Sequence, residues 1–321
     1  MPVINLQDIQ DARKAIAPFV KCTPLTRSQF LSKLCGGDVW LKLENLQVTN
    51  SFKPRGAFNR LLHLSAEERG GIITASAGNH GHAVAYAAQK LEFPAKIVAP
   101  KTTPKIKIDA IKEYGADLVL FGDIYDEAEQ QAKKLALKDG YAYISPYNDE
   151  LTIAGHGTVG LEIIEALPNV DVVIVPVGGG GLISGLSIAV KSIKPSVQVI
   201  GVQSEASPVM YESFRVGRIV EARNAVTIAE GLSGGIEEDS ITFKIVHEYV
   251  DEMLLVREET IRRAVYLLWT WEKQVAEGSG AAAIAPIMEN KSLFADKTVV
   301  AVITGGNIDA ELFQGIAAAE S

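Results

Sequence analysis

The chain has 321 residues, of which 47% are hydrophobic, and it carries a formal net charge of -8 at pH 7. This length and composition allow a large buried core and predict two domains. We do not expect a nucleic acid partner, because the chain is acidic and has no block of lysines and arginines to hold phosphates.

Two further features restrict the class of protein. Cys22 and Cys35 are the only cysteines and no CxxC spacing occurs, so we expect neither a disulfide framework nor a structural zinc site. No apolar run approaches the length of a membrane span, so we expect no membrane partner either. Both features suit a cytoplasmic protein.

Short apolar runs alternate with longer helical patterns along most of the chain. The predicted strands are Val39–Leu43, Ile72–Ala75, Lys96–Ala99, Leu118–Phe121, Val172–Val177, Val197–Val202, Met253–Val256 and Val299–Thr304. The predicted helices between them are Asn79–Lys90, Pro104–Tyr114, Asp123–Lys138, Ile183–Ile193 and Glu258–Trp269. Apolar runs joined by helices are typical of parallel sheets covered by helices on both faces, so we predict an α/β fold.

A change of pattern divides the chain. From about residue 48 to about residue 146, short strand–helix units form a compact block. The stretch ISPYNDELTIAGHG, residues 144–157, is then predicted to be irregular chain before the next helix. We therefore predict a smaller domain, residues 48–147, inserted into a larger domain made of residues 1–47 and 148–321.

Four consecutive glycines, Gly178–Gly181, follow a predicted buried strand and precede a predicted helix. The first amides of a helix have no partner within the helix and lie at its positive end, so this place suits a phosphate. The alternative is a tight turn that binds nothing. A Walker A loop is excluded because no Lys-Ser/Thr pair follows Gly181. A dinucleotide fingerprint is nearly present, with Ser184 at its third glycine position, so an NAD-dependent dehydrogenase is an alternative.

The stretch SFKPRGA places Lys53 just before a helix that is predicted to open at Pro54 or soon after. An ammonium near the positive end of a helix is destabilised, so we expect a lowered pKa for Lys53, as an imine-forming lysine requires. The alternative is an ordinary solvated lysine beside Arg55.

Two more stretches run from a predicted strand into small residues. In ITASAGNHGHAVAYAAQ, the amides of residues 76–79 could receive a carboxylate, unless Asn79 only caps the helix that follows. His80 and His82 do not suit a metal site, because residues two apart face different sides of a helix. In VVAVITGGNID, Thr304 would present its hydroxyl at the carboxyl edge of a parallel sheet, where ligands of α/β folds bind. A plain turn is the alternative there.

Together, and in this order, the four stretches resemble the fold-type-II pyridoxal-phosphate enzymes, in the branch of the serine and threonine dehydratases (threonine ammonia-lyases). The resemblance covers nearly the whole chain and includes TPL at residues 23–25, LKLENLQ at 41–47, IAGHGTVGLEI at 153–163 and EGSGAAA at 277–283. It implies two domains built on parallel-rich twisted sheets, pyridoxal 5'-phosphate as cofactor, and a homo-oligomer, either a dimer or a tetramer. Because the chain ends soon after TGGNID, we expect the short form of the family, without a regulatory domain.

The resemblance also implies a role for each residue that matches its motifs. Lys53 would be the catalytic residue, which bonds covalently to the cofactor, and Phe52 would pack near the cofactor ring. Asn79 would hydrogen-bond the 3'-oxygen of the cofactor, and Thr304 would meet its pyridine nitrogen. The residues that would hold the phosphate are Gly178, Gly179, Gly180, Gly181 and Leu182, and those that would line the substrate-carboxylate loop are Ser76, Ala77, Asn79 and His80. No residue is assigned to a metal.

The implied activity is β-elimination from an amino acid such as L-threonine or L-serine, which yields a 2-oxo acid and ammonia. The substrate amine would displace Lys53, which would then remove the α-proton as general base. Serine racemase and other hydroxy-amino-acid dehydratases are alternatives within the fold. Ala77 stands where the racemase has a second serine that moves a proton, and Glu230 in AEGL leaves the preference for threonine open. A non-catalytic ligand sensor is the alternative outside the enzymes.

Overall fold

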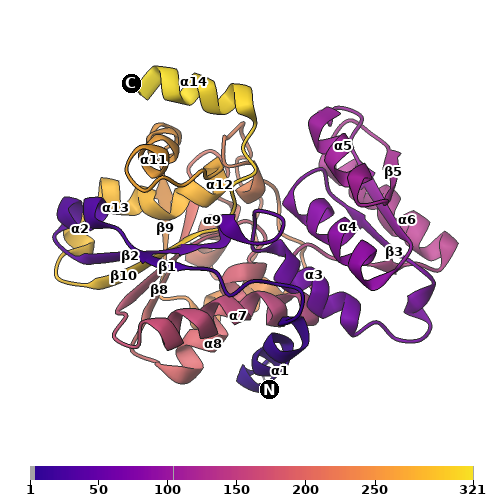
Figure 1. Ribbon diagram of the computed structural model, residues 1–321, viewed down its shortest axis with the longest axis horizontal. Helices are drawn as coiled ribbons and strands as arrows, with labels where there is room; N and C mark the ends of the chain where they lie inside the picture. The colour runs from indigo at the N-terminus through magenta and orange to yellow at the C-terminus, as the bar shows by residue number, and fades with distance from the viewer. Residues whose placement is uncertain (1–3, 104, 321) are drawn as a thin grey trace.

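The computed structural model describes residues 4–103 and 105–320, which form two sheets flanked by helices (Figure 1). The larger sheet has six strands in the order β1-β2-β10-β7-β8-β9. All neighbouring pairs are parallel except β1 and β2. These strands are β1 (Leu25–Arg27), β2 (Asp38–Leu43), β7 (Val172–Pro176), β8 (Gln198–Ser204), β9 (Glu252–Val256) and β10 (Thr298–Ile303).

The smaller sheet is entirely parallel and has the order β5-β4-β3-β6. Its strands are β3 (Ile72–Ala75), β4 (Ala95–Ala99), β5 (Asp117–Leu120) and β6 (Ala142–Tyr143). With its helices it lies to one side of the larger sheet, on the right of Figure 1. All four strands fall within residues 48–147, and the exact boundaries of the two domains stay a prediction.

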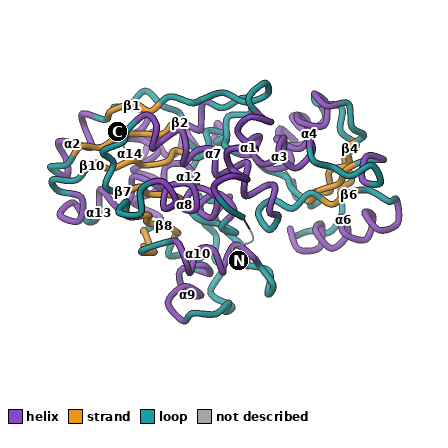
Figure 2. Tube along the Cα trace, turned by 90° about the horizontal axis from the view of Figure 1, so that it is seen from below, coloured by secondary structure: helices purple, strands orange, loops and turns teal. Residues whose placement is uncertain are grey.

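Helices cover both sheets (Figure 2). The α-helices are α1 (Leu6–Ile16), α2 (Gln29–Cys35), α3 (Lys53–Leu62), α4 (Asn79–Leu91), α5 (Lys105–Glu113), α6 (Tyr125–Asp139), α7 (Glu150–Ala166), α8 (Gly181–Ile193), α9 (Val209–Val216), α10 (Ile241–Tyr249), α11 (Glu258–Thr270), α12 (Gly278–Ala281), α13 (Ala285–Glu289) and α14 (Ala310–Glu320). Short 3-10 turns are η1 (Glu44–Leu46), η2 (Glu68–Gly70), η3 (Glu230–Leu232), η4 (Ala282–Ile284) and η5 (Lys291–Phe294). No helix in the described residues is long and apolar enough to cross a membrane.

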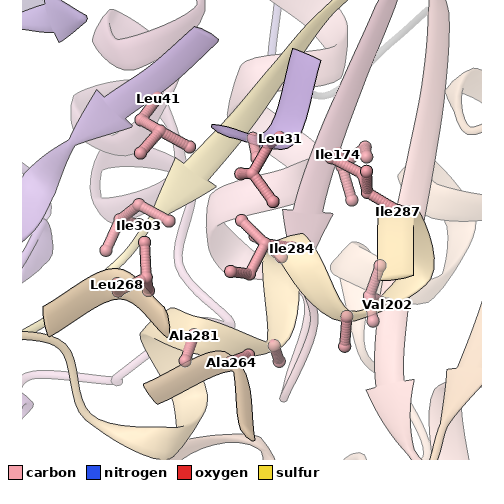
Figure 3. Packing of buried hydrophobic residues seen from close by; sticks show 14 of the residues in the cluster. Leu31, Leu41, Ile174, Val202, Ala264, Leu268, Ala281, Ile284, Ile287 and Ile303 are labelled. Carbon is pink, nitrogen blue, oxygen red and sulfur yellow. The ribbon is translucent and has the colours of Figure 1, made fainter. Parts of the chain in front are cut away.

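The core of the larger sheet lies on both of its faces. On one face, Ile174 of β7 packs with side chains of α2 and of the segments from α11 to α13 (Figure 3). On the other face, the neighbouring Val173 and Val175 pack against α7 and α8. Adjacent strand residues point to opposite faces, so a strand covered on both sides is apolar at every position. This explains why the runs read from the sequence are unbroken rather than alternating.

Each strand and helix predicted from the sequence is present, with its ends within two residues of the prediction wherever both ends are described. The predicted helix start at Pro104 lies outside the described residues. The short strands β1 and β6 were not predicted. They have three and two residues, too few to show a hydrophobic period.

The prediction of irregular chain over residues 144–157 is wrong in its second half, because α7 begins at Glu150. The side chain of Asp149 caps this helix by accepting a hydrogen bond from the amide of Thr152 at 2.7 Å. The glycines that suggested irregular chain serve close packing. A Cβ at Gly155 would lie 2.3 Å from the carbonyl oxygen of Arg55 on α3, and one at Gly157 would lie 2.8 Å from that of Gly185 on α8.

Candidate active site

Three of the four motif segments begin where a parallel strand ends. Strand β3 ends before Ser76, β7 before the glycine segment (residues 178–181), and β10 before Thr304. The fourth segment is joined to Thr304 directly. Ser51 forms an isolated antiparallel bridge with Gly305, and the amide of Phe52 donates to the carbonyl oxygen of Thr304 at 3.1 Å. The start of α3 therefore lies at the carboxyl edge of the larger sheet.

Lys53 is the first residue of α3 and is half-buried. Its Nζ donates to the carbonyl oxygen of Pro146 at 2.8 Å and lies 5.0 Å from the centroid of the Phe52 ring. Burial lowers the pKa of Lys53 to about 8, and the carboxylate of Glu277 offsets only part of this effect. The direction agrees with the sequence prediction, whereas the main cause is loss of water rather than the helix dipole.

The glycine segment leaves its amides unpaired and is tightly packed elsewhere. Helix α8 begins at Gly181, and within the described chain the amides of residues 178–182 donate to no other protein group. A Cβ at Gly179 would lie 2.4 Å from the ring of Tyr147, and one at Gly178 would lie 2.7 Å from the carbonyl oxygen of Gly231. Glycine is thus required for packing, while the amides at the helix start stay available to an anion. Because Tyr147 follows Pro146, this pair connects the glycine segment to Lys53.

Asn79 is held from both ends of its side-chain amide. Its Nδ2 donates to Oε1 of Glu277 at 2.7 Å, and its Oδ1 accepts from Nδ2 of Asn307 at 2.7 Å. The N-cap residue of α4 is Gly78, so the alternative in which Asn79 only caps this helix does not hold. Burial raises the pKa of Glu277 to about 7, although the hydrogen bond from Asn79 lowers it.

The loop after β3 offers free amides beside a neutral histidine. The amides of Ala77, Asn79 and His80 donate to no protein group in the described part of the chain, whereas that of Gly78 is taken by Oγ of Ser76 at 3.1 Å. The Nε2 of His80 lies 3.1 Å from the carbonyl oxygen of Ile144, which can only accept, so we assign the proton to Nε2. Burial, followed by the charge of Lys53, lowers the pKa of His80 to about 3, and the ring is neutral at pH 7.

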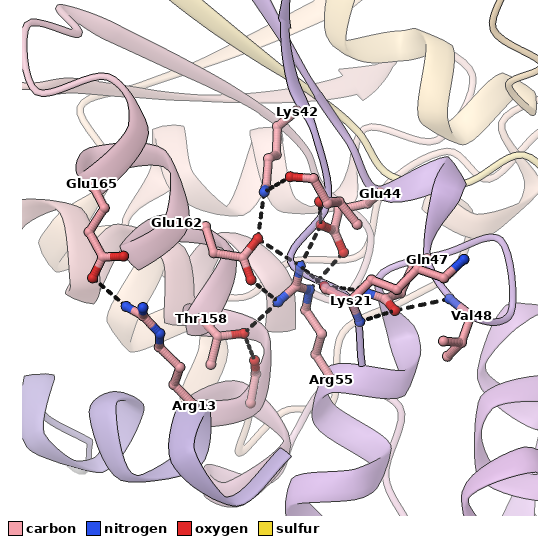
Figure 4. Close-up of polar contacts among 12 residues, drawn as sticks. Arg13, Lys21, Lys42, Glu44, Gln47, Val48, Arg55, Thr158, Glu162 and Glu165 are labelled. Carbon is pink, nitrogen blue, oxygen red and sulfur yellow. Dashed lines mark hydrogen bonds and ion pairs between the residues drawn. The ribbon is translucent and has the colours of Figure 1, made fainter. Parts of the chain in front are cut away.

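A buried ionic network anchors α3 immediately after Lys53 (Figure 4). The guanidinium of Arg55 bonds both carboxylate oxygens of Glu44 at 2.8 Å and both of Glu162 at 2.6 and 3.0 Å. Lys42 also pairs with Glu162 and donates to the carbonyl oxygen of Thr23 at 2.7 Å. Burial alone lowers the pKa of Arg55, but the two carboxylates outweigh it and raise that pKa. The positive charges of Lys42 and Arg55 thus balance the two buried carboxylates, which no cation in solvent needs to neutralise.

The sequence matches the family described as pyridoxal-phosphate dependent enzyme over residues 16–305. The chain belongs to this family. L-threonine ammonia-lyase of Thermotoga maritima is 47% identical over 315 residues, which cover 98% of this chain and 78% of that protein. The processed form of threonine deaminase isoform 2 from Solanum lycopersicum has a TM-score of 0.92 at 36% identity. The match covers 99% of this chain and 91% of that one. Maize serine racemase has a TM-score of 0.92 at 32% identity and covers 98% of both chains.

The predicted family and fold class are confirmed, and pyridoxal phosphate is the cofactor of this pyridoxal-phosphate dependent enzyme. The residues at the site fit such a group. An amine of lowered pKa, such as that of Lys53, suits its aldehyde, and unpaired amides, such as those of the glycine segment, suit its phosphate. The described residues contain no group of three or more His, Cys, Asp and Glu side chains that could hold a metal ion.

Two residues of this pyridoxal-phosphate enzyme received no role from the sequence. Glu277 and His156 lie in the quoted motifs EGSGAAA and IAGHGTVGLEI. The ring of His156 is in edge-to-face contact with Phe52 at 4.7 Å between centroids. Burial and the nearby charge of Lys53 lower the pKa of His156 well below its usual value, so it is a neutral neighbour of the amine. The available signal was an ionisable residue flanked by small ones, because small residues mark close packing.

Proposed function

We propose that this chain is an ammonia-lyase that dehydrates and deaminates a β-hydroxy amino acid, with L-threonine as the first substrate and L-serine as the second. One observation carries the proposal. The Lys53 amine, whose pKa is lowered, donates to the carbonyl oxygen of Pro146, and the next residue, Tyr147, packs on the glycine segment, whose amides are unpaired within the described residues. The relative named L-threonine ammonia-lyase supports the choice of substrate. When bound, the cofactor supplies the electron-withdrawing ring that makes the α-proton of an attached amino acid acidic.

Lys53 is the proposed general base. A lysine with a pKa of about 8 is partly neutral near that pH, whereas an ordinary lysine, with a pKa near 10.5, is almost fully protonated. A base works best when its pKa lies near the working pH. His80 and His156 do not compete for the proton, because burial keeps both rings neutral and lowers their basicity.

The other predicted site residues bind and orient in this proposal. The amides of Gly178, Gly179, Gly180, Gly181 and Leu182 would hold the phosphate, and Phe52 would pack against the cofactor ring. The substrate carboxylate would take the free amides of the loop made by Ser76, Ala77, Asn79 and His80. Thr304, which is 4% exposed, would meet the pyridine nitrogen with a neutral hydroxyl. A neutral partner leaves the ring a weaker electron sink than an acid would, which favours prompt loss of the β-hydroxyl.

The direct test is product release from purified protein with a panel of hydroxy amino acids. We expect a yellow protein whose cofactor borohydride fixes to Lys53, and equal amounts of 2-oxo acid and ammonia from L-threonine. A colourless protein that binds NAD would support a dehydrogenase instead. A yellow protein that releases no oxo acid from any member of the panel would support a ligand sensor.

A racemase is distinguished by D-serine formation. Racemisation needs a proton donor on the face opposite the base, and Ala77 has no group that carries a proton. We expect oxo acid to exceed D-serine by at least about tenfold when L-serine is the substrate, measured by chiral chromatography. Equal yields of the two products would contradict the assignment.

Replacement of a glycine in the segment should weaken cofactor binding. The Cβ of Gly179→Ala would lie 2.4 Å from the Tyr147 ring, and overpacking of this kind costs about 1–3 kcal/mol. Where this cost falls on the cofactor-bound form, affinity drops by up to roughly 5–150-fold. Gly235→Ala is the matched control, because the added Cβ meets nothing within 4 Å. Cofactor release after dilution, followed by absorbance, should separate the two variants. Equal release rates would contradict the role of this segment.

We also propose that the protein is a cytoplasmic homo-oligomer, either a dimer or a tetramer. Large apolar side chains are exposed at and after the end of α11, with Trp269 at 42%, Trp271 at 61% and Val275 at 48%. Large exposed apolar side chains suit an association surface. Sedimentation velocity of the purified protein would give the oligomeric state.

A further inference from the structure

The segment that carries Glu277 is packed between two loops of the site. A Cβ at Gly278 would lie 2.3 Å from the carbonyl oxygen of Ile228, and one at Gly280 would lie 2.4 Å from that of Gly305. The amide of Glu277 donates to the carbonyl oxygen of Gly305 at 3.1 Å. The backbone of residue 277 is therefore fixed beside Gly305, and the absence of a side chain at Gly305 leaves room for the Glu277 carboxylate.

From this position, the carboxylate sets the orientation of the Asn79 side chain. Turning that amide by 180° would place its oxygen against the carboxylate of Glu277 and its NH2 against the NH2 of Asn307. Asn307 is itself held, because its Nδ2 also donates to the carbonyl oxygen of Thr49 at 2.9 Å. Only one orientation satisfies all these groups. In it, one N–H of Asn79 Nδ2 is used by Glu277 and the other has no acceptor in the described part of the chain.

We propose that Glu277 is a positioning residue, which orients the Asn79 amide so that it presents an N–H to the 3'-oxygen of the cofactor. The inference rests on the proposed function and adds to it the group that controls Asn79. An N–H donor stabilises negative charge on that oxygen, whereas a reversed amide would place a carbonyl oxygen against it.

The charge of Glu277 depends on pH near neutrality. The groups that act on it are the Asn79 amide on α4, Lys107 on α5, Glu230 in η3 and Lys53 on α3. Burial raises the pKa of the carboxyl to about 7, so the charged form, which accepts the stronger hydrogen bond, dominates above that pH. The hydrogen bond from Asn79 to Glu277 should therefore weaken as the pH falls through about 7.

The test compares holoenzyme variants by the absorbance spectrum of the bound cofactor and by kcat and KM. Glu277→Ala should change the spectrum and lower kcat roughly 10–100-fold with less change in KM, because a misplaced hydrogen-bond donor acts on the reacting group rather than on substrate binding. Glu277→Gln keeps an oxygen that accepts from Asn79 and should restore most of kcat. Its kcat should also fall less steeply than that of the wild type as the pH drops through about 7, because only Lys53 still gains a proton in that range.

The double variant decides whether Glu277 acts through Asn79. If it does, the double variant Asn79→Ala with Glu277→Ala should be no slower than Asn79→Ala alone. Without the Asn79 amide, Glu277 has nothing left to orient. Multiplied losses, or an unchanged spectrum in Glu277→Ala, would overturn the inference. Ser279→Ala is the matched control in the same segment. Its Oγ accepts from the amide of Gly231 and not from Asn79, so its spectrum should equal that of the wild type.

Failure of the inference and failure of the proposed function give different results. A wild type that releases no oxo acid, combined with a spectrum that responds to Glu277→Ala but not to Ser279→Ala, would reject the lyase and support the positioning role. An active wild type whose spectrum and kcat do not change in Glu277→Ala would support the lyase and reject the positioning role. If Glu277→Ala does not fold, the pH profile of Glu277→Gln still decides, because a profile identical to that of the wild type would overturn the inference.

Discussion

Replacement of Lys53 by alanine is expected to lower kcat by at least about 10²–10⁴-fold, the usual loss when a general base is removed. Lys53→Arg should be equally slow, because a guanidinium keeps its proton at any working pH and cannot replace the amine. Both variants should also lose fixation of the cofactor by borohydride, detected by mass spectrometry of the peptide that contains residue 53. Oxo-acid release by Lys53→Ala at the wild-type rate would refute the role of this residue.

Lys14→Ala is the matched control for loss of a lysine. Lys14 lies on α1 with 74% of its side chain exposed, and within the described residues it pairs only with Asp11 on the same helix. An exposed pair of this kind contributes about 0–1 kcal/mol to stability. This variant should therefore keep both the wild-type rate and fixation of the cofactor.

The second large effect is expected from the buried ionic network. Glu162→Ala leaves Arg55 and Lys42 with the single carboxylate of Glu44, and so buries an uncompensated positive charge. Breaking a buried pair costs about 3–5 kcal/mol of the free energy of unfolding. Because Arg55 lies two residues after Lys53, cofactor affinity should fall as well. Urea unfolding of the cofactor-loaded protein, with affinity measured in parallel, checks both effects.

Glu165→Ala separates burial from charge. Glu165 lies on the same helix, α7, but its pair with Arg13 is exposed, at 56% and 44% of the two side chains, and Figure 4 shows both pairs. Its loss should cost less than about 1 kcal/mol. Equal destabilisation by the two variants would mean that the buried network contributes no more than a surface pair.

Acid should weaken the same network. Burial alone raises the pKa of Glu162, but Arg55 and Lys42 lower it overall below its usual value of 4.5. A carboxyl whose pKa is lower in the folded state contributes stability above its unfolded pKa and loses it as the pH falls through the folded value. We therefore expect the difference in unfolding free energy between wild type and Glu162→Ala to be constant near neutral pH and to shrink below about pH 4.5.

The sequence was sufficient for the features that depend on local pattern. The β7 run is apolar at every position because both of its faces are covered. The four glycines after it stood out in the sequence, and in the structure Tyr147 and Gly231 leave no room for a Cβ at Gly178 or Gly179. The lysine before a proline at a helix start was visible in the same way. In this order such patterns also identified the family, because their combination is far more specific than any one of them.

The tertiary structure was needed wherever a contact joins distant parts of the chain. Helix α7 exists despite its glycines because α3 and α8 pack closely on it. The lowered pKa of Lys53 comes mainly from burial, which no local pattern measures. The pairing of Asn79 with Glu277 joins residues 198 apart, and their spacing carries no trace of it. Local periodicity thus predicted the longer strands, the helices between them and the motifs. The folded chain alone decided which polar groups are buried together, and hence which of them can hold or move a proton.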